Sequence, residues 1–317
     1  MKKYLNVMKK LPLACPCCKK ESLKQLKNSF ICLNKECLHN NEKNGFSIIK
    51  SIPILICEIH TDTVCTKNSI ETYVDRPLSK YKDIKKIILG ESKITKKNCE
   101  NFIKNLFLST KKPKVLVIGG GERGSGTDKL WNNKEIEIHS IDIYASNNVD
   151  AVCDGHYLCL ENNYYDGVWI QAVLEHVVEP NVVVDEIFRV LKTNGLVYAE
   201  TPFMQQVHEG AYDFTRFTVL GHRYLFKKFE LIELGGNEGP EIVFAWSIRY
   251  LMWSLFRNKN LAKIIGIVSR IIIRPLGYFT SKKSMYDSSS GVFFLGRKKY
   301  NHNLSHKKLI GLYKGQF

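Results

Sequence analysis

Residues 115–126 are Val115-Leu116-Val117-Ile118-Gly119-Gly120-Gly121-Glu122-Arg123-Gly124-Ser125-Gly126. The β-branched run, which begins at Lys114, predicts a buried strand, and the glycines after it predict a tight turn that leads into a helix. Glycine permits a sharp turn and lets a ligand come close to the backbone. Open amides at the start of the next helix favour polar or anionic ligand groups. Taken alone, this pattern is also compatible with a turn that binds nothing.

The residues after this glycine loop alternate between strand and helix patterns. We predict strands at residues 136–143, 165–171 and 195–200, and a helix at residues 182–191 that ends at Gly195. A last strand at residues 291–297 is expected to return antiparallel to the edge of the sheet. This alternation predicts an α/β fold with a Rossmann-like, doubly wound and mostly parallel sheet.

Two aspartates follow the glycine loop at the ends of predicted strands. Asp142 lies about twenty residues after the loop, where a carboxylate can accept hydrogen bonds from both ribose hydroxyls of a nucleoside. The alternative for Asp142 is a helix cap. Asp154, which precedes Gly155, can bind an adenine amino group, and its alternative is an aspartate that stabilises a turn.

The segment Tyr165-Asp166-Gly167-Val168-Trp169-Ile170-Gln171-Ala172-Val173-Leu174-Glu175-His176-Val177 completes the pattern. The order of glycine loop, Asp142, Asp154 and this segment resembles class I S-adenosylmethionine-dependent methyltransferases, closest to the type 11 branch. The stretch Val182–Pro202 matches that branch as well, and the resemblance covers roughly residues 113–235. A dehydrogenase is disfavoured, because the segment around Glu175 has no role in that kind of enzyme.

The resemblance implies S-adenosyl-L-methionine as the cofactor and assigns its contacts. Gly119, Gly121 and Gly124 would line the methionine moiety, and Asp142 would hold the ribose. Asp154 with Gly155 would flank the adenine, and Gln171 and Leu174 would lie beside the reactive methyl group. The chain departs from the family at Val117, where an acidic residue is usual, and in the extra Glu122-Arg123, so the amide contacts of the loop are open.

Four cysteines near the N-terminus have the spacing of a metal site. Cys15 and Cys18 form a Cys-x-x-Cys pair, and Cys32 and Cys37 form a Cys-x4-Cys pair after residues 19–31. Four thiolates suit a tetrahedral, structural zinc ion, without which so small a module would lack a sufficient core. His39 is an alternative to Cys37, and Cys17 is an alternative to Cys18. With Phe46–Leu55, the segment resembles the Trm112-like ribbon, which occurs as a separate activator of methyltransferases and fused to them.

The N-terminus lacks the pattern of a signal peptide, and no window of 18 residues is free of charge. We therefore expect a cytoplasmic protein, peripheral at the inner membrane face at most, whose cysteines do not form disulfides. The cysteines outside the predicted zinc site are expected to be small buried apolar side chains; they are Cys17, Cys57, Cys65, Cys99, Cys153 and Cys159.

The net charge of +16 favours an anionic partner, such as a nucleic acid, a phosphorylated substrate or a membrane surface. The alternative is a Lys-rich composition without such a partner. We predict a zinc ribbon at residues 1–57, a basic helical linker at 58–112, a methyltransferase domain at 113–300 and a polar tail at 301–317. An apolar and basic helical insertion at about 241–280 interrupts the methyltransferase domain. Residues 246–279 would lie on an anionic membrane surface, pack over the sheet or form a dimer contact; the oligomeric state is left open.

The loop after the strand at 195–200 carries the candidates for the methyl acceptor site. His208 has a pKa near neutrality and is the candidate general base. Asp213 would orient His208 or bind sugar hydroxyls, and Arg216 would hold an acidic or phosphorylated group. Alternatively, Asp213 and Arg216 pair with each other and tie the loop to the body.

Residues 208–218 are similar to methyltransferases found with bacterial surface-glycan assembly enzymes. This similarity favours O-methylation of a sugar or other small-molecule hydroxyl in polysaccharide biosynthesis. The first alternative is a ribosomal or transfer RNA methyltransferase, which the positive charge favours. Against it, Thr201-Pro202-Phe203 stands where such enzymes carry a different motif, and no Arg/Lys block with interleaved aromatic residues is present. The second alternative is a non-catalytic cofactor-binding partner protein.

Overall fold

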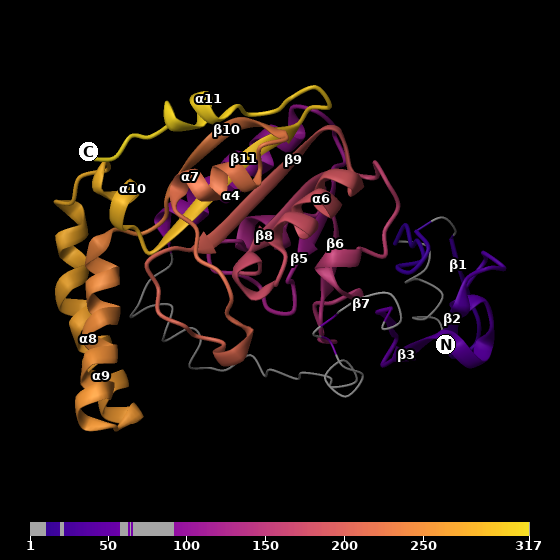
Figure 1. The fold of residues 1–317 in the computed structure, drawn as a ribbon, viewed down its shortest axis with the longest axis horizontal. Coiled ribbons are helices and arrows are strands. Elements are labelled where there is room, and N and C mark those ends of the chain that lie inside the picture. Colours follow the sequence, from indigo (N-terminus) through magenta and orange to yellow (C-terminus); the bar gives the residue numbers. More distant parts are fainter. Residues whose placement is uncertain (1–10, 20–21, 58–62, 64, 66–91, 317) are drawn as a thin grey trace.

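The computed structural model describes residues 11–19, 22–57, 63, 65 and 92–316. Their strands form one sheet in the order β1-β2-β3-β4-β7-β6-β5-β8-β9-β11-β10. The strands are β1 Leu23–Gln25, β2 Ser29–Cys32, β3 Phe46–Ile49, β4 Ile52–Leu55, β5 Lys114–Ile118, β6 Glu137–Asp142, β7 Ala151–Cys153, β8 Tyr165–Gln171, β9 Leu191–Pro202, β10 Phe229–Gly236 and β11 Gly291–Lys298. The N-terminal strands lie at one end of the molecule and the helices α8 (Pro240–Phe256) and α9 (Lys259–Ile273) at the other (Figure 1).

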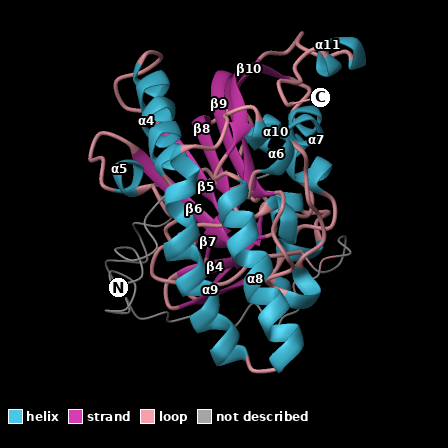
Figure 2. Cartoon of the chain, turned by 90° about the vertical axis from the view of Figure 1, so that its left-hand side faces the viewer, coloured by secondary structure: helices cyan, strands magenta, loops and turns pink. Residues whose placement is uncertain are grey.

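Helices cover both faces of the central sheet. Figure 2 shows α4 (Lys93–Phe107) and α5 (Asp128–Trp131) on one side of the strands, and α6 (Pro180–Val190) and α7 (Val219–Leu225) on the other. The shorter elements are α10 Ser284–Ser288, α11 His306–Ile310, η1 Leu38–Asn40, η2 Glu42–Asn44, η3 Gly155–Tyr157, η4 Leu174–His176, η5 Gly210–Tyr212 and η6 Arg274–Tyr278. This arrangement is the predicted doubly wound α/β fold.

The central strands β7, β6, β5, β8 and β9 are parallel, and β11 is antiparallel to its neighbours. The mostly parallel sheet with an antiparallel last strand is thus confirmed. The expected edge position of that strand is wrong, because β11 lies between β9 and β10. Strand β10, which the sequence analysis did not predict, forms the edge instead.

The predicted helix end at Gly195 is also wrong. Helix α6 ends at Val190, and Leu191 already pairs with Tyr165 as the first residue of β9. The next paired residue on β9 is Leu196, opposite Gly167, so residues 192–195 form an irregularity within the strand. Asn194 takes a positive φ of 65° there. The polar residues and the glycine therefore mark a bulge rather than a helix terminus.

Helix α4 covers the face of the sheet beneath β5 and β8. Its cap residue Ser92 accepts a hydrogen bond from the Thr95 amide at 3.2 Å, as a serine at a helix N-terminus commonly does. Phe102 and Leu106 are buried in one core cluster with Trp169. Gly167 permits this close packing, since a Cβ there would lie 2.8 Å from the Phe102 ring. Within the segment predicted as a basic helical linker, residues 93–107 are helical, and residues 66–91 lie outside the described residues.

The cysteine-rich segment belongs to the same sheet as the α/β domain. Strand β4 pairs in parallel with β7, with Ile54 opposite Val152. Lys19 forms an ion pair of 2.9 Å with Glu186 on α6. The cysteine-rich segment and the α/β domain therefore share one sheet rather than touching only at a linker.

A disulfide joins Cys17 and Cys57 within this segment. The expectation that no cysteine forms a disulfide is wrong for this pair. The two residues are 40 positions apart. Only the folding of the cysteine-rich segment brings the turn that contains Cys17 next to the residues that follow β4. Cys65, Cys99, Cys153 and Cys159 are free and buried, as predicted.

Candidate functional site

The candidate site lies where the order of the central strands reverses. From β5 the chain proceeds outward to β6 and β7, and then crosses to β8 and β9 on the other side of β5. In open α/β sheets, ligands bind beyond the carboxyl ends of the strands at such a reversal. The glycine loop after β5 and the short helix η4 after β8 meet at this point.

The glycine loop packs tightly against the ends of the neighbouring strands. Gly119 has a φ of +75°, and a Cβ there would lie 2.2 Å from a methyl carbon of Val173. A Cβ on Gly124 would lie 2.2 Å from the side-chain oxygen of Gln171. Gly119 requires glycine, because of its positive φ and its close approach to the branched Val173, whereas a side chain at Gly124 would displace the Gln171 side chain.

Asp142 ends β6 and holds the glycine loop directly. Its Oδ2 accepts a hydrogen bond of 2.7 Å from the Gly121 amide, and its Oδ1 accepts one of 2.7 Å from the Ile143 amide. A carboxylate oxygen can accept more than one hydrogen bond, so a carboxylate that binds the loop can also bind ribose hydroxyls. The position of Asp142 beside the loop fits a nucleoside ligand. Its hydrogen bonds come from the glycine loop and from the next residue, and not from the first turn of a helix, so they disfavour the helix-cap alternative.

Asp154 is engaged by residues of its own turn and of the ribbon side. Its Oδ1 accepts hydrogen bonds from the His156 amide at 2.9 Å and lies 2.7 Å from His156 Nδ1, while its Oδ2 accepts one from the Thr63 hydroxyl at 2.7 Å. Burial alone would raise the pKa of Asp154, but the bonds from His156 and Thr63 lower it overall. These contacts favour the turn-stabilising alternative. The neighbouring Gly155 is buried against Val183, and the adenine role of both residues stays a prediction.

Gln171 belongs to a polar network that the sequence analysis missed. Its Nε2 donates to the Ser125 carbonyl and to Glu200 Oε1, both at 3.3 Å. Glu200 also accepts hydrogen bonds from the hydroxyls of Tyr198 at 2.6 Å and Thr95 at 3.0 Å. The network joins β8, β9 and α4 beneath the glycine loop. Its only sequence signal is an acidic residue at the end of a buried strand, directly before Thr201-Pro202.

Helix η4 carries a buried carboxylate at the centre of the site. The chain reaches η4 through Ala172, whose φ of 54° is unusual for a residue with a side chain. Leu174 is fully buried in the core cluster of the α6 side. The Glu175 side chain is 0% exposed, and burial raises its pKa to about 8. Among the residues that the structure describes, none donates a hydrogen bond to either carboxylate oxygen of the Glu175 side chain.

The loop between β9 and α7 folds over η4. The amides of Phe214 and Thr215 donate to the Glu175 carbonyl at 2.8 and 3.3 Å. The Nδ1 atom of His176 lies 2.7 Å from the Tyr212 carbonyl oxygen, and its ring contacts that of His208 at 4.8 Å between centroids. The structure therefore brings the predicted loop residues to the segment predicted to face the reactive methyl.

His208, Asp213 and Arg216 lie together in this loop. Asp213 Oδ2 accepts a hydrogen bond from the His208 amide at 2.9 Å and lies 3.2 Å from His208 Nδ1. Arg216 donates to both Asp213 oxygens and holds the pKa of that carboxyl down at about 2. Burial and the neighbouring His176 lower the pKa of His208, so its ring is neutral at neutral pH.

The contacts separate the alternatives for these three residues. The guanidinium of Arg216 also donates to the carbonyls of Gln205 and Gln206, at 3.0 and 3.3 Å, and to that of Thr215 at 2.9 Å. Its donors are thus used within the loop, which favours a structural role over binding an acidic acceptor. Asp213 both anchors the loop and orients His208, whereas the His208 side chain is 28% exposed and accessible.

The sulfur atoms of Cys15, Cys18, Cys32 and Cys37 lie within 4.8 Å of one another. The Cys15–Cys37 and Cys18–Cys32 sulfur distances are 3.8 and 3.5 Å. Four sulfurs at tetrahedral bond lengths from zinc are about 3.8 Å apart, so this cluster fits the ion. Burial raises the pKa of the Cys15 thiol to about 11. The alternatives His39 and Cys17 lie in a separate group with Cys57.

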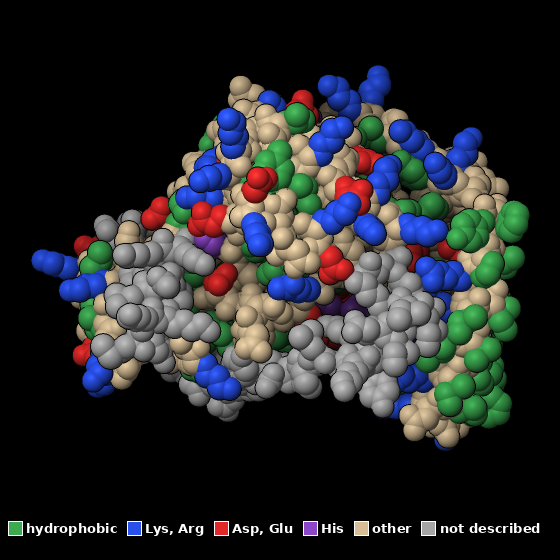
Figure 3. Space-filling model, turned by 180° about the vertical axis from the view of Figure 1, so that it is seen from behind, with side chains coloured by type: hydrophobic (Ala, Val, Ile, Leu, Met, Phe, Trp, Pro, Cys, Tyr) green, Lys and Arg blue, Asp and Glu red, His purple; other side chains and the backbone are tan. Residues whose placement is uncertain are grey.

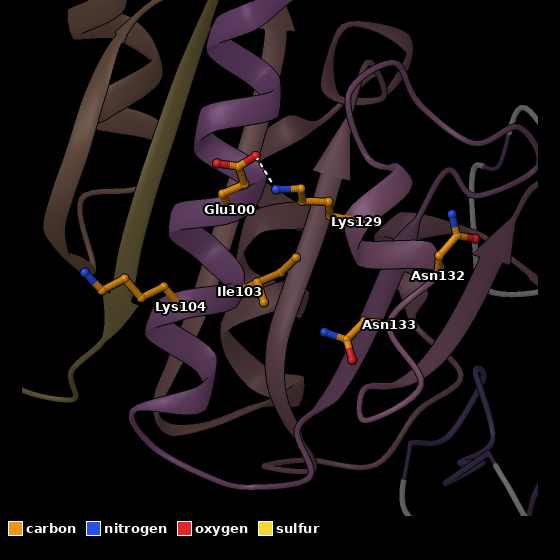
Figure 4. Close-up of a pocket in the computed structure, with 6 residues that line it drawn as sticks. All are labelled: Glu100, Ile103, Lys104, Lys129, Asn132 and Asn133. Atoms are coloured by element: carbon orange, nitrogen blue, oxygen red, sulfur yellow. Dashed lines mark ion pairs between the residues drawn. The ribbon is translucent and has the colours of Figure 1, made fainter.

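Two surface hollows accompany these groups. A small one is lined by Gly119, Glu122, Gly124, Trp169 and Gln171, between the glycine loop and β8. A broader one lies between α4 and α5, where the ion pair of Lys129 with Glu100 crosses it (Figure 4). No residue predicted to bind the cofactor lines the broader hollow, so it is separate from the candidate site.

Solved structures similar to this chain have low sequence identity to it. One is the Haemonchus contortus phosphoethanolamine N-methyltransferase 2 in complex with S-adenosyl-L-methionine, at 18% identity over 67% of this chain and 55% of that one, with a TM-score of 0.42. Another is an S-adenosylmethionine-dependent methyltransferase from Archaeoglobus fulgidus, at 14% identity over 69% of this chain and 100% of that one, with a TM-score of 0.42. The [4+2]-cyclase SpnF aligns at 14% identity over 65% of this chain and 81% of that one, with a TM-score of 0.39. At these values the similarities indicate neither substrate nor activity.

The sequence comparison is more specific. No curated protein sequence matches the chain. Residues 117–199 match a family model described as a methyltransferase domain. The matched range contains the glycine loop, Asp142 and the whole of β8 with η4, which are the elements that meet at the strand reversal. The match and this geometry together support a class I S-adenosylmethionine-dependent methyltransferase.

Proposed function

We propose that the protein transfers the methyl group of S-adenosyl-L-methionine to a hydroxyl of a sugar or glycan. The observation that carries the proposal is the packing of the loop with His208 and Asp213 over η4, at the carboxyl end of β8. With Nδ1 facing Asp213, the remaining nitrogen of His208 is available to an acceptor hydroxyl. Methyl transfer is an in-line displacement, and an oxygen nucleophile must lose its proton.

The cofactor contacts in this proposal are those that the family resemblance implies. Gly119, Gly121 and Gly124 would form the wall for the methionine moiety, and Asp142 would bind the ribose. Gln171, held by Ser125 and Glu200, would lie beside the methyl group with Leu174. S-adenosylmethionine supplies an electrophilic methyl on a sulfonium, so the chain itself needs to orient the acceptor and manage one proton.

The test is methyl transfer from radiolabelled S-adenosylmethionine to two sets of acceptors. One set contains nucleotide-linked and lipid-linked sugars, and the other contains ribosomal and transfer RNA. Base-stable label in the sugar fraction, lost in Asp142→Ala and kept in the surface control Asp185→Ala, would support the proposal. Label in RNA alone would overturn it in favour of the RNA alternative, and transfer seen only after addition of a second protein would favour the partner alternative.

We propose in addition that Cys15, Cys18, Cys32 and Cys37 bind a structural zinc ion in a Trm112-like ribbon. The sulfur spacing supports this, as does the absence of an open coordination position in a set of four thiolates. The ribbon would support the α/β domain from within the same chain through the β4–β7 pairing.

We propose that the α8–α9 hairpin rests on an anionic membrane surface. Of its residues, only Ile242, Ala245 and Ala262 are buried, and its large apolar side chains form a continuous group at one end of the molecule (Figure 3). The exposed members include Phe244, Leu251, Trp253, Leu255, Phe256, Leu261, Ile264, Val268, Ile271 and Ile272. Among the described helices, none is long and apolar enough to cross a bilayer.

The charge of the hairpin favours a lipid surface over a protein. Helix α9 contains no acidic residue, and Glu241 is the only acid of α8. Arg249, Arg257, Lys259, Lys263 and Arg270 accompany the apolar side chains, as in helices that lie at an anionic interface. Flotation with vesicles that contain anionic lipid should recover the wild-type protein and should fail with Trp253→Ser/Ile272→Ser. Equal binding of the two proteins to the vesicles would contradict this orientation. So would a wild-type protein that forms a dimer and does not bind the vesicles.

A further inference from the structure

We propose that Glu175, His176 and His208 form a binding site for one divalent transition-metal cation at the mouth of the candidate active site. One ligand atom from each residue lies within 4.8 Å of the others. Two imidazoles and one carboxylate suit ions such as zinc, manganese and iron(II), and three protein ligands leave a coordination position open. The site is distinct from the four-cysteine cluster, whose ligands are all sulfur.

The environment of Glu175 is the strongest independent sign of a missing cation. Its side chain is 0% exposed, and within the described part of the chain its oxygens receive no hydrogen bond. Among the described residues, Nε2 of His176 forms the ion-pair contact, at 3.6 Å from Oε1. Buried carboxylates in proteins are paired, hydrogen-bonded or bound to a metal. The ion-pair contact of Glu175 is long, and no described residue donates a hydrogen bond to its carboxylate. The carboxylate lies next to the two histidines that would complete a metal site.

Both histidines are oriented as metal ligands are. His176 Nδ1 lies 2.7 Å from the Tyr212 carbonyl oxygen, which can only accept, so Nδ1 carries the proton and donates. His208 Nδ1 lies 3.2 Å from Asp213 Oδ2, an ion-pair distance that favours the proton on this nitrogen. Each ring then has Nε2 as its free lone pair. A carbonyl or carboxylate behind a histidine is the usual arrangement that fixes the tautomer of a metal ligand.

The other charges around the cluster do not oppose a cation. Arg216 is the nearby positive group, and its charge is paired with Asp213 through both carboxylate oxygens. Glu175 would therefore contribute the net negative charge at the site once a bound cation has displaced its proton. The β9–α7 loop also holds η4 in place, because the amides of Phe214 and Thr215 donate to the Glu175 carbonyl.

The role of the ion, unlike its binding, rests on the proposed methyl transfer. A hydroxyl that occupies the open position would have a lowered pKa and would release its proton to solvent. The oxygen would then form a bond to the methyl carbon as the bond from carbon to sulfur breaks, with its electron pair left on S-adenosylhomocysteine. His208 would serve as a ligand in this state rather than as the general base.

Manganese(II) binding to the full-length protein tests the site without cofactor or acceptor. Thiolate sites disfavour manganese, so the protein, with zinc retained at its cysteines, is titrated with Mn²⁺ while the signal of free Mn²⁺ is followed by electron paramagnetic resonance. We expect one equivalent to bind in the wild type and the Kd to rise at least tenfold in Glu175→Gln and in His208→Gln. The control His306→Gln changes an exposed histidine on α11 and should bind as the wild type does.

Circular dichroism and S-adenosylmethionine affinity verify that each variant is folded. His208 is partly exposed, so its variant remains informative if Glu175→Gln does not fold. The proposal would be overturned if the wild type bound Mn²⁺ no more tightly than His208→Gln does. It would also be overturned if the control His306→Gln lost as much Mn²⁺ affinity as His208→Gln. Because no methyl is transferred in this assay, its failure is independent of any failure of the proposed function.

Discussion

Replacement of Asp142 by alanine is predicted to weaken S-adenosylmethionine binding at least tenfold. The carboxylate lies at the end of β6 and accepts the Gly121 amide at 2.7 Å, so the change removes both the ribose acceptor and an anchor of the glycine loop. Hydrogen bonds to a charged group contribute about 1.5–3 kcal/mol each. Water replaces part of this loss, and a tenfold change in Kd, about 1.4 kcal/mol, is the lower bound that we expect.

The assay is isothermal titration of S-adenosylmethionine into wild type, Asp142→Ala, Asp142→Asn and Asp185→Ala. Asp142→Asn retains one acceptor oxygen without the charge and should lie between wild type and Asp142→Ala. Asp185 forms an exposed ion pair with Lys228 on the protein surface and should bind the cofactor normally when replaced. If folded Asp142→Ala binds within twofold of wild type, Asp142 does not hold the ribose and the assignment of the loop fails with it.

Two further predictions concern the metal cluster and stability against acid. Cys15→Ser should reduce bound zinc from about one equivalent per chain to less than half and lower the melting temperature, whereas Cys65→Ala, outside the cluster, should retain the metal; retention by both would contradict the ribbon. Burial lowers the pKa of His222 to about 3, so the native state resists protonation while the unfolded state gains a proton below its pKa of about 6.5. Stability is therefore complete above that value and falls with decreasing pH, by about 2 kcal/mol from this group between pH 6.5 and 5. Denaturant unfolding at both pH values should show this loss in wild type and a correspondingly smaller one in His222→Leu, and an equal loss in the two proteins would show that another group is responsible.

The central strands were predictable because their signal is local. Strands β5 and β8 have the bounds predicted from the sequence, since both are buried on two faces and consist of continuous apolar runs. Strand β10 has exposed or half-exposed residues such as Glu230 and Glu233 along most of its length. Its place in the sheet comes from pairing with β11, which begins at Gly291, far along the chain. No window of the sequence contains that information.

The same distinction applies to the candidate site. The four cysteines could be assigned from spacing, because each pair lies on one tight turn and only the meeting of the two turns is tertiary. Gln171 could be placed by resemblance, but its dependence on Glu200 and Thr95 could not, because these residues come from β9 and α4. Likewise the proximity of Glu175 to His208 has no signal in the sequence, since the backbone bonds of the loop at residues 214–215 bring the two together.

The position of the ribbon within the sheet has a consequence for how the two parts of the chain depend on each other. Strand β4 ends beside β7, and β7 leads directly into Asp154. Thr63, which follows the ribbon, donates to that same carboxylate. If the proposed zinc ion is lost from the cysteine-rich segment, we therefore expect one edge of the sheet to be released next to the predicted adenine end of the cofactor site. Because Ile54 of β4 shares a buried core cluster with Val152 of β7, binding at the proposed zinc site and cofactor binding are expected to be coupled through the sheet rather than through a hinge between independent domains.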